Sequence, residues 1–253
     1  MDKKIGIVDI ILPNFNREKS LKETINSILN QSFQNFNLYI IDDFSSDKSI
    51  ETIRNYSDSR IKIIQLKRNK GVYFCRNLGM RVSSSKYLAF VDSDDYWDKD
   101  KLEKQISFME KFNHKFTYTD YIAFKEQNSK RVFKKKINVR EKFNFNQFIN
   151  NSSIAMSSVI IERSIINNLK FKKLKICEDY LFKCEILKKQ DAFKCKDTTM
   201  FYRISKNSLQ SNKLRNFYWV WSINKKYNKL SIYRNFISLF SITINSIKKY
   251  GLR

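Results

Sequence analysis

The sequence predicts an α/β protein with a mostly parallel central sheet flanked by helices, followed by a basic, helical C-terminal extension. Short apolar runs alternate with segments of helical spacing through the first 112 residues. Two of these runs stop at carboxylates, at Asp43 and at Asp92, as buried parallel strands do where they end at a ligand-binding sheet edge. From Leu214 onward the helical spacing continues, now among basic and aromatic residues. These observations together favour one large α/β domain with a smaller helical annex.

Four strands are expected in the first half of the chain. Alternation of strands and helices at this short spacing gives βαβ units with right-handed crossovers, which place the strands in parallel. The expected strands are Ile5–Leu12, which ends at the only proline, Phe36–Ile41, Ile61–Leu66 and Tyr87–Val91.

The helices between these strands are marked by capping residues and apolar spacing. Ser20 with Glu23 fits a capping box at the start of the first helix. Later helices are expected around Ile50, from Gly71 towards Val82, and after an N-terminal cap at Asp98 or Asp100.

The second half has a different pattern. Phe116–Phe124 and Arg131–Phe133 read as a hairpin, and Met156–Ile161 reads as a further strand. The segment LKICEDYLFKCEILKK predicts a helix with Glu178 and Asp179 in its first turn. Carboxylates in that position are stabilised by the helix dipole, so simple helix capping explains them when the segment is considered alone.

Composition sets limits on the partners and the compartment. The formal net charge of +24 favours anionic partners, although the basic residues are spread along the whole chain. Four cysteines without a CxxC pair and a single histidine, His114, predict reduced thiols and no zinc site. No signal-peptide pattern precedes the first strand and no run is long enough to span a membrane. We therefore expect a cytoplasmic protein, with attachment to the inner face of the cell membrane as the alternative.

The segment Lys86 to Trp97, KYLAFVDSDDYW, carries the clearest chemical signal. Its apolar run stops at Asp92, Asp94 and Asp95. Carboxylates at alternate positions can converge on one hard cation such as Mg²⁺ or Mn²⁺, which leaves coordination positions for phosphate oxygens. A solvated acidic turn is the alternative for an isolated DxD sequence. The preceding strand and the following helix favour a metal-diphosphate site.

Five motifs in order resemble the family 2 glycosyltransferases, including those of bacterial surface-polysaccharide synthesis. The motifs are VDIILPNFNR, SILNQSFQNFNLYIIDDFSSD, NKGVYFCRNLGM, YLAFVDSDDYWDKDKLEKQ and CEDY, and they extend from Val8 to about Arg203. Each is weak alone, but the ordered set is specific. The resemblance implies the Rossmann-like glycosyltransferase A-type fold, with a nucleotide-sugar-binding half (1–112), an acceptor-binding half of the same domain (113–213) and a C-terminal extension (214–253).

The resemblance also implies where the donor nucleotide binds. The loop from Pro13 to Arg17, which includes Asn16, corresponds to the segment that packs against the base, with Phe15 at the position of a stacking ring. Asp43 corresponds to the residue that hydrogen-bonds uracil in enzymes that use UDP-sugars. The remaining donor contacts implied by the family are Asn69, Lys70, Gly71 and Arg76 beneath the diphosphate and sugar, and Asp92 with Ser93 at the strand end.

Metal, catalytic and phosphate-binding residues are carried over in the same way. Asp92 and Asp94, followed by Asp95, match the ligands of a divalent cation, Mn²⁺ or Mg²⁺. Asp179 in CEDY matches the catalytic base, and Glu178 beside it is the second candidate. Downstream, Arg203 and Lys206 are expected to contact phosphate, with surface solvation as the alternative.

The implied reaction is transfer of a sugar, with inversion, from a nucleotide-sugar to a saccharide or lipid-linked acceptor in polysaccharide or glycan biosynthesis. A UDP-linked donor is expected because Asp43 matches the uracil contact. A divalent cation offsets charge on the departing diphosphate, and a positioned aspartate accepts the proton of the acceptor hydroxyl. No covalent nucleophile is needed for a single displacement.

Two other classes remain open at this point. A nucleotidyltransferase-like enzyme has a similar sheet, but such enzymes have a glycine-rich first loop and Pro13 to Arg17 contains no glycine. A nucleic-acid-binding module would explain the positive charge, yet it has no use for acidic strand ends. We therefore expect no nucleic-acid partner.

The C-terminal segment raises a question about a further partner. It is basic, and Phe236, Phe240, Ile244 and Ile247 recur at helical spacing. Such a helix either lies on an anionic membrane surface or packs its apolar face against the catalytic domain. The sequence alone leaves both alternatives open.

Overall fold

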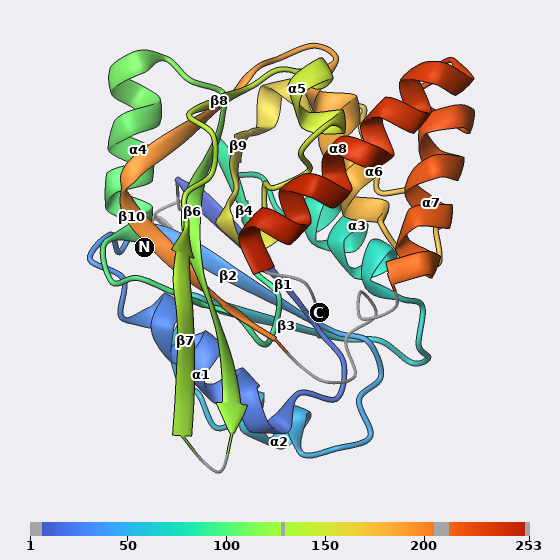
Figure 1. Cartoon of the computed structure of the whole chain (residues 1–253). Helices are drawn as coiled ribbons and strands as arrows, with labels where there is room; N and C mark the ends of the chain where they lie inside the picture. The colour runs from blue at the N-terminus through green and yellow to red at the C-terminus, as the bar shows by residue number, and fades with distance from the viewer. Residues whose placement is uncertain (1–6, 128–129, 205–212, 251–253) are drawn as a thin grey trace.

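The first four strands form the parallel part of the sheet (Figure 1). The structure is a computed structural model that describes residues 7–127, 130–204 and 213–250. All four expected strands are present, although Pro13 lies inside the first of them and not after it. β1 (Val8–Asn14) pairs in parallel with β2 (Phe36–Asp42) and β4 (Tyr87–Phe90), and β3 (Ile61–Gln65) pairs in parallel with β2.

Within the described residues, the second half extends this sheet to ten strands in the order β3-β2-β1-β4-β9-β6-β10-β5, with β7 on β6 and β8 on β10. The short β9 runs antiparallel to both neighbours, whereas β6 and β10 are parallel. The predicted α/β class with a mostly parallel central sheet is therefore confirmed. The added strands are β5 (Tyr96–Trp97), β6 (Phe116–Gln127), β7 (Lys130–Ile137), β8 (Lys142–Phe143), β9 (Ile160–Glu162) and β10 (Ala192–Arg203).

The structure differs from the sequence analysis at two strands in the second half: one was predicted too long and one was not predicted. The segment expected as one strand, Met156–Ile161, begins with a 3₁₀ turn, η1 (Met156–Ser158), and only its end belongs to β9. The Ser158 hydroxyl donates to the Ala155 carbonyl at 2.7 Å, a local bond that favours the turn over a strand. β10 was not expected, because polar residues interrupt its alternation and its pairing with β6 shifts register between Cys195 and Thr199.

The helices expected from periodicity are present, but their caps differ, and α5 was not expected. α1 starts at Glu18, so Ser20 lies inside its first turn, where its hydroxyl donates to the Ser93 carbonyl at 3.0 Å. Asp100 is the N-cap residue of α4 but makes no side-chain capping bond, because its carboxylate pairs with Lys104. The helices are α1 (Glu18–Leu29), α2 (Ser49–Arg54), α3 (Val72–Val82), α4 (Lys101–Phe112), α5 (Phe145–Ile149), α6 (Glu178–Leu187), α7 (Lys213–Lys226) and α8 (Ile232–Tyr250), with a second 3₁₀ turn, η2 (Arg163–Ile165).

Close packing of α3 against β1 fixes one side of the ligand-binding edge. A Cβ atom at Gly79 would lie 2.6 Å from Cγ2 of Ile11, so only glycine allows the helix to approach the sheet this closely. The other glycine of this region, Gly71, immediately precedes the helix. The contact at Gly79 therefore holds the N-terminal part of α3 beneath the ends of the strands.

α7 and α8 lie side by side at the edge of the molecule next to α5 and α6 (Figure 1). The helical character expected for the C-terminal segment is confirmed over residues 213–226 and 232–250. In the parts of the chain that the structure describes, no helix combines the length and the apolar character needed to cross a membrane.

Lys101, at the start of α4, is a fully buried lysine. Its ammonium nitrogen lies 4.1 Å from the centroid of the Trp97 ring and donates to Oε1 of Gln105 at 3.0 Å. Burial lowers the pKa of Lys101 from 10.5 to about 7. Because the unfolded chain binds more protons than the folded one between these values, this lysine makes stability rise with pH from about 7 to 10.5.

We expect Lys101→Met to raise the free energy of unfolding by about 1–3 kcal/mol at and below pH 7, and so to raise the melting temperature there. The substitution removes a buried charge but leaves Gln105 without its donor, which limits the gain. Thermal unfolding followed from pH 6 to 10 should show a flatter profile than that of the wild type. The exposed Lys99→Met is the matched control, and an equal pH profile for Lys101→Met and the wild type would contradict the assignment.

Candidate functional site

The carboxyl ends of β1, β2 and β4 meet at one edge of the sheet. Asn14 at the end of β1 lies opposite Asp42 in the parallel register, and its side chain donates to Oδ1 of Asp42 at 2.8 Å. The chain then continues from β2 to Asp43 and from β4 to Asp92. The expected convergence of acidic strand ends on this edge is thus present in the structure.

Asp43 holds the loop that enters α3. Its two carboxylate oxygens accept the backbone N–H groups of Lys70 and Gly71, each at 2.7 Å. Gly71 has φ of +87°, a left-handed conformation that suits glycine. Asn69 donates its side-chain amide to the Asp43 carbonyl at 3.3 Å. The segment from Asn69 to Gly71, here called the NxG loop, is therefore fixed at the sheet edge. Its contact with a donor diphosphate stays a prediction.

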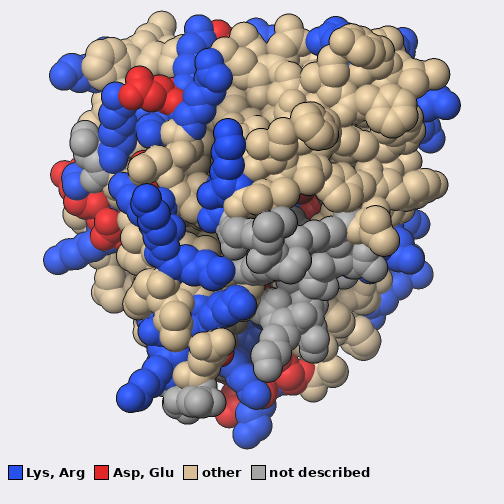
Figure 2. All heavy atoms as spheres, viewed as in Figure 1, with Lys and Arg blue, Asp and Glu red and all other residues tan. Residues whose placement is uncertain are grey.

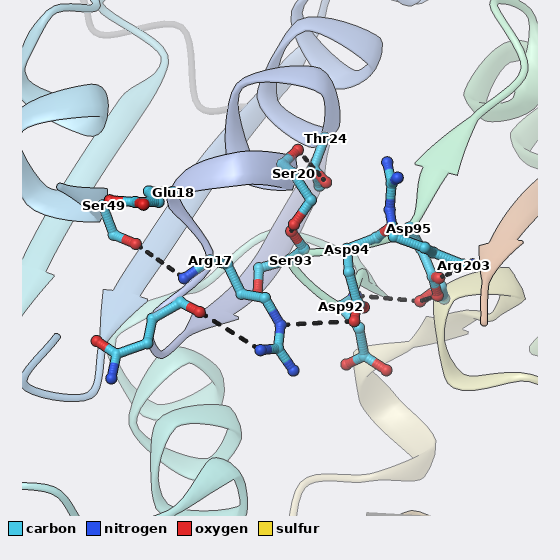
Figure 3. A network of polar contacts seen from close by, with 12 residues as sticks. Arg17, Glu18, Ser20, Thr24, Ser49, Asp92, Ser93, Asp94, Asp95 and Arg203 are labelled. Carbon is cyan, nitrogen blue, oxygen red and sulfur yellow. Dashed lines mark hydrogen bonds and ion pairs between the residues drawn. The ribbon is translucent and has the colours of Figure 1, made fainter. Parts of the chain in front are cut away.

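The loop after β1 presents two side chains to solvent. Phe15 is 45% exposed, as a ring that stacks on a nucleotide base must be before binding. Asn16 has φ of +50° and accepts the Ser46 N–H at 2.8 Å, which holds the loop. Arg17 is the second exposed side chain, and its Nε lies 3.5 Å from Oδ2 of Asp94 (Figure 3). Pro13 is buried within β1, so its ring does not face solvent as Phe15 does.

Asp92 and Asp94 are the two carboxylates of the strand end that suit a cation. Burial, followed by the nearby charge of Asp92, raises the pKa of Asp94 above its ordinary value. A divalent cation between them would relieve this repulsion, and hard cations bind such oxygen ligands. No group of three His, Cys, Asp or Glu side chains in the described residues is arranged to hold a metal ion. A cation held by this pair of carboxylates would need further ligands, such as the oxygens of a substrate diphosphate.

That Asp95 is a third metal ligand stays a prediction, and the structure gives both of its carboxylate oxygens protein partners. One of its carboxylate oxygens accepts the Ser157 hydroxyl at 2.5 Å and the other accepts the Arg203 N–H at 3.0 Å. The side chain is buried, and burial together with Asp94 and Asp92 raises its pKa well above the ordinary value. Asp95 therefore ties the DxD turn to η1 and β10 (Figure 3).

Arg203 has its own set of protein partners. Its guanidinium donates to Glu23 at 2.5 Å, to the Asp94 carbonyl at 3.0 Å and to Glu126, and it stacks over the Phe124 ring. These contacts show that Arg203 holds the DxD turn, and its expected contact with phosphate stays a prediction. Lys206, the other phosphate-binding candidate, lies outside the described residues.

Arg76 joins the two halves of the site. It is buried, and it donates to Oδ1 of Asp92 at 2.6 Å and to Oε1 of Glu178 at 2.7 Å. Burial opposes its charge, but Asp92 and Glu178 prevail and raise the pKa of Arg76 above its ordinary value. Glu178 is itself buried, and burial raises its pKa despite Arg76. Glu178 therefore acts as a partner of Arg76, which leaves Asp179 as the candidate base.

Asp179 lies in the first turn of α6 and pairs with Lys183 one turn later. The ammonium nitrogen of Lys183 lies 2.8 Å from Oδ2 of Asp179 and also donates to the Ile154 carbonyl at 2.7 Å. Burial acts to raise the pKa of Asp179, but Lys183 and Arg76 outweigh it and hold the pKa below its ordinary value. Asp179 is therefore ionised at neutral pH and able to accept a hydrogen bond from an acceptor hydroxyl.

A pocket of about 160 Å³ brings Asp92 and Asp179 together, although they lie far apart in the sequence. Among its other lining residues, the sequence analysis identifies Asp95 through the DxD motif. Lys183 could also be identified from sequence, because it lies four residues after Asp179 on an expected helix. The sequence carries no signal for the remaining lining residues, because loop packing brings them together. The pocket is lined by Asp92, Asp95, Tyr121, Ser152, Ser153, Ile154, Ala155, Met156, Asp179, Lys183 and Tyr202.

The family model for glycosyl transferase family 2 matches residues 9–170, which include the sheet edge, the NxG loop and the DxD turn. The chain belongs to this family and is a glycosyltransferase. This assignment excludes the nucleotidyltransferase and the nucleic-acid-binding module as its primary class.

Individual relatives are similar over nearly the whole chain. The UDP-Glc:alpha-D-GlcNAc-diphosphoundecaprenol beta-1,3-glucosyltransferase WfgD of Escherichia coli is 32% identical over 247 residues, which cover 97% of this chain and 95% of WfgD.

Two solved structures share the glycosyltransferase A-type fold. Residues 1–349 of TarS from S. aureus in complex with UDP-GlcNAc superpose with a TM-score of 0.70 at 20% identity, over 95% of this chain and 72% of that one. The mannosyltransferase PcManGT from Pyrobaculum calidifontis, in complex with GDP-Man and Mn²⁺, superposes with a TM-score of 0.69 at 13% identity, over 98% and 76%.

Proposed function

We propose that the protein is an inverting, metal-dependent glycosyltransferase that moves a sugar from a UDP-linked donor to a saccharide or lipid-linked acceptor in surface-glycan synthesis. The observation that carries this proposal is the shared pocket of Asp92 and Asp179. One residue belongs to the DxD turn at the sheet edge, and the other is an ionised carboxylate on α6. A donor held at the edge would therefore expose its anomeric carbon to an acceptor next to Asp179.

The proposed step is a single displacement. The acceptor hydroxyl oxygen attacks the anomeric carbon, the bond from that carbon to the diphosphate oxygen breaks, and its electrons leave with the nucleoside diphosphate. Asp179 accepts the hydroxyl proton through its carboxylate, and Lys183 keeps that carboxylate ionised and oriented. Attack from the face opposite the leaving group inverts the anomeric configuration.

Asp92 and Asp94 would hold the divalent cation, Mn²⁺ or Mg²⁺. When bound, the cation supplies charge neutralisation on the diphosphate leaving group. Arg76 keeps one oxygen of Asp92 in place through its 2.6 Å bond, and Asp95 with Arg203 fixes the turn that carries Asp94. Support for a bound metal comes from this carboxylate pair and from PcManGT, which shares the fold and was solved in complex with Mn²⁺.

The donor and acceptor classes draw support from the relatives. The name of WfgD specifies UDP-Glc as donor and a diphosphoundecaprenol-linked sugar as acceptor, and TarS was solved with UDP-GlcNAc. The described residues contribute Phe15 for a base and the Asp43-braced NxG loop for a diphosphate. For a lipid-linked acceptor, transfer takes place at a membrane surface.

A thermal-shift titration with UDP, GDP, CDP and dTDP, each with and without Mn²⁺, tests the donor site. We expect UDP with Mn²⁺ to raise the melting temperature, because a ligand that binds only the folded state stabilises it by mass action. Asp94→Ala should lose this shift.

The matched control is Asp191→Ala, which removes a carboxylate that is ion-paired with Lys142 away from the sheet edge. It should keep the full shift with UDP and Mn²⁺. The absence of any shift in the wild type, or an equal shift in Asp94→Ala, would contradict the proposed metal and donor site.

A further inference from the structure

α8 packs on the protein mainly through polar residues, with Leu239 and Ile242 against the core, and presents most of its large apolar side chains to solvent. The usual surface helix does the reverse, with its apolar stripe against the core. The outward residues fall within about 140° of the helix circumference at roughly 100° per residue. They are Ile232, Tyr233, Phe236, Ile237, Phe240, Ile244 and Ile247, here called the α8 apolar face, and Tyr233 and Phe240 are 75% and 70% exposed.

Hydrogen bonds between buried polar residues hold α8 in this orientation. The side-chain amide of Asn224 on α7 donates to Oδ1 of Asn235 and to Oγ of Ser238, each at 3.1 Å. Ser238 in turn donates to the Ile149 carbonyl at 2.6 Å. All three side chains are buried, so rotating α8 to bury its apolar face would leave them without partners.

Contacts further along α8 support the same orientation. The Asn245 amide donates to the Asn150 carbonyl at 3.1 Å, and the Lys249 ammonium donates to Oδ1 of Asn151 at 3.0 Å. The outward orientation of the apolar residues is therefore fixed along most of the helix.

The exposed apolar residues form a continuous surface. Figure 2 shows a broad area over α8 without Lys or Arg, bordered by basic side chains. Trp221 of α7 packs against Phe236 with ring centroids 4.8 Å apart, which adds an aromatic ring beside the face. An exposed apolar surface of this kind marks an interaction site.

The charge around this surface indicates an anionic partner. Residues 213 to 250 contain eight Lys and Arg and no Asp or Glu, and the whole chain carries a net charge of +24. An apolar helix face rimmed by basic residues suits an anionic bilayer, where apolar side chains enter the acyl boundary and cations meet the headgroups. The exposed basic residues of this segment are Lys225, Lys226, Lys229, Arg234 and Lys248.

We propose that the α8 apolar face docks the protein on an anionic lipid bilayer. α8 contacts a short stretch of chain whose next residues line the reaction pocket. α8 bonds to Ile149, Asn150 and Asn151, and the next residues, Ser152 to Ile154, line the pocket that contains Asp179. Docking therefore brings the pocket close to the headgroup region. That a lipid-linked acceptor is used there rests on the proposed function.

Vesicle flotation tests the docking surface directly. The full chain is mixed with vesicles of phosphatidylethanolamine and phosphatidylglycerol, or of phosphatidylcholine alone, at low and high salt. We expect binding to the anionic vesicles at low salt, weaker binding at high salt, and little binding to phosphatidylcholine. Phe236→Ser/Phe240→Ser should bind the anionic vesicles about tenfold or more weakly.

The matched control is Ile63→Ser/Phe112→Ser, which removes two exposed apolar side chains from β3 and α4. It should bind the anionic vesicles like the wild type, and circular dichroism should show both variants folded. Equal flotation of Phe236→Ser/Phe240→Ser and the wild type would overturn the proposal. The proposal would also be overturned if light scattering showed the wild type to be a dimer and Phe236→Ser/Phe240→Ser to be a monomer. The α8 apolar face would then be an interface between two copies of the chain.

The thermal shift with UDP and Mn²⁺ is measured without vesicles, so the two proposals fail separately. Flotation without a nucleotide-induced thermal shift would support the docking surface and contradict the proposed donor site. A nucleotide shift without flotation removes the docking surface alone.

Discussion

Asp179→Asn is expected to lower kcat by about 10²- to 10⁴-fold while leaving the thermal shift with UDP and Mn²⁺ unchanged. The substitution keeps the size and shape of the side chain but removes the carboxylate proposed to accept the acceptor proton. Donor binding should persist because the residues proposed to contact the donor, Phe15 and the NxG loop, are untouched. Turnover is measured as release of UDP in the presence of a saccharide acceptor.

Glu185→Gln provides the control on the same helix, since Glu185 pairs with Lys188 near the surface of α6. It should turn over like the wild type. Near-wild-type turnover of Asp179→Asn with intact donor binding would remove Asp179 as the base and return attention to Glu178.

Arg76→Met is expected to lower the unfolding free energy by about 3–5 kcal/mol and to abolish turnover. Without the guanidinium, Glu178 remains as a buried carboxylate without its ion-pair partner, and Asp92 loses the bond that orients it. Urea denaturation measures the stability, and UDP release measures the activity. The exposed pair of Lys196 and Glu141 supplies the comparison, because Lys196→Met should leave the unfolding free energy almost unchanged.

The double variant Arg76→Met/Glu178→Gln separates stability from function. It should regain part of the lost stability, because the buried charge is gone, but it should not regain turnover, because Asp92 still lacks its partner. A single Arg76→Met variant as stable and active as the wild type would show that the ion pairs contribute nothing to the site.

The parallel strands and their acidic ends could be predicted from sequence because each is a local pattern. An apolar run such as Tyr87–Phe90 followed by Asp92 specifies both a buried strand and the sheet edge where it ends. The roles within the acidic cluster were not local. Asp94 and Asp95 are neighbours in the sequence, but only the positions of Ser157 and the Arg203 backbone, set by η1 and β10, show that the Asp95 carboxylate also braces the turn.

The C-terminal helices illustrate a different limit. Periodicity identifies α8 as an amphipathic helix, but it contains no information about which face meets the protein. That choice depends on Asn224 of another helix and on the Ile149 carbonyl, whose positions follow from tertiary packing. Helix existence was therefore predictable, whereas helix orientation was not.

The ion pairs of Arg76 have a consequence for how such enzymes diversify. One guanidinium neutralises a carboxylate at the end of β4 and another at the start of α6. A chimaera that joined residues 1–112 to the second half of a relative would keep a charge-balanced junction only if the incoming half supplied a carboxylate at the same place. Any exchange of the second half would therefore have to preserve the ion pair between Arg76 and a carboxylate at the start of α6.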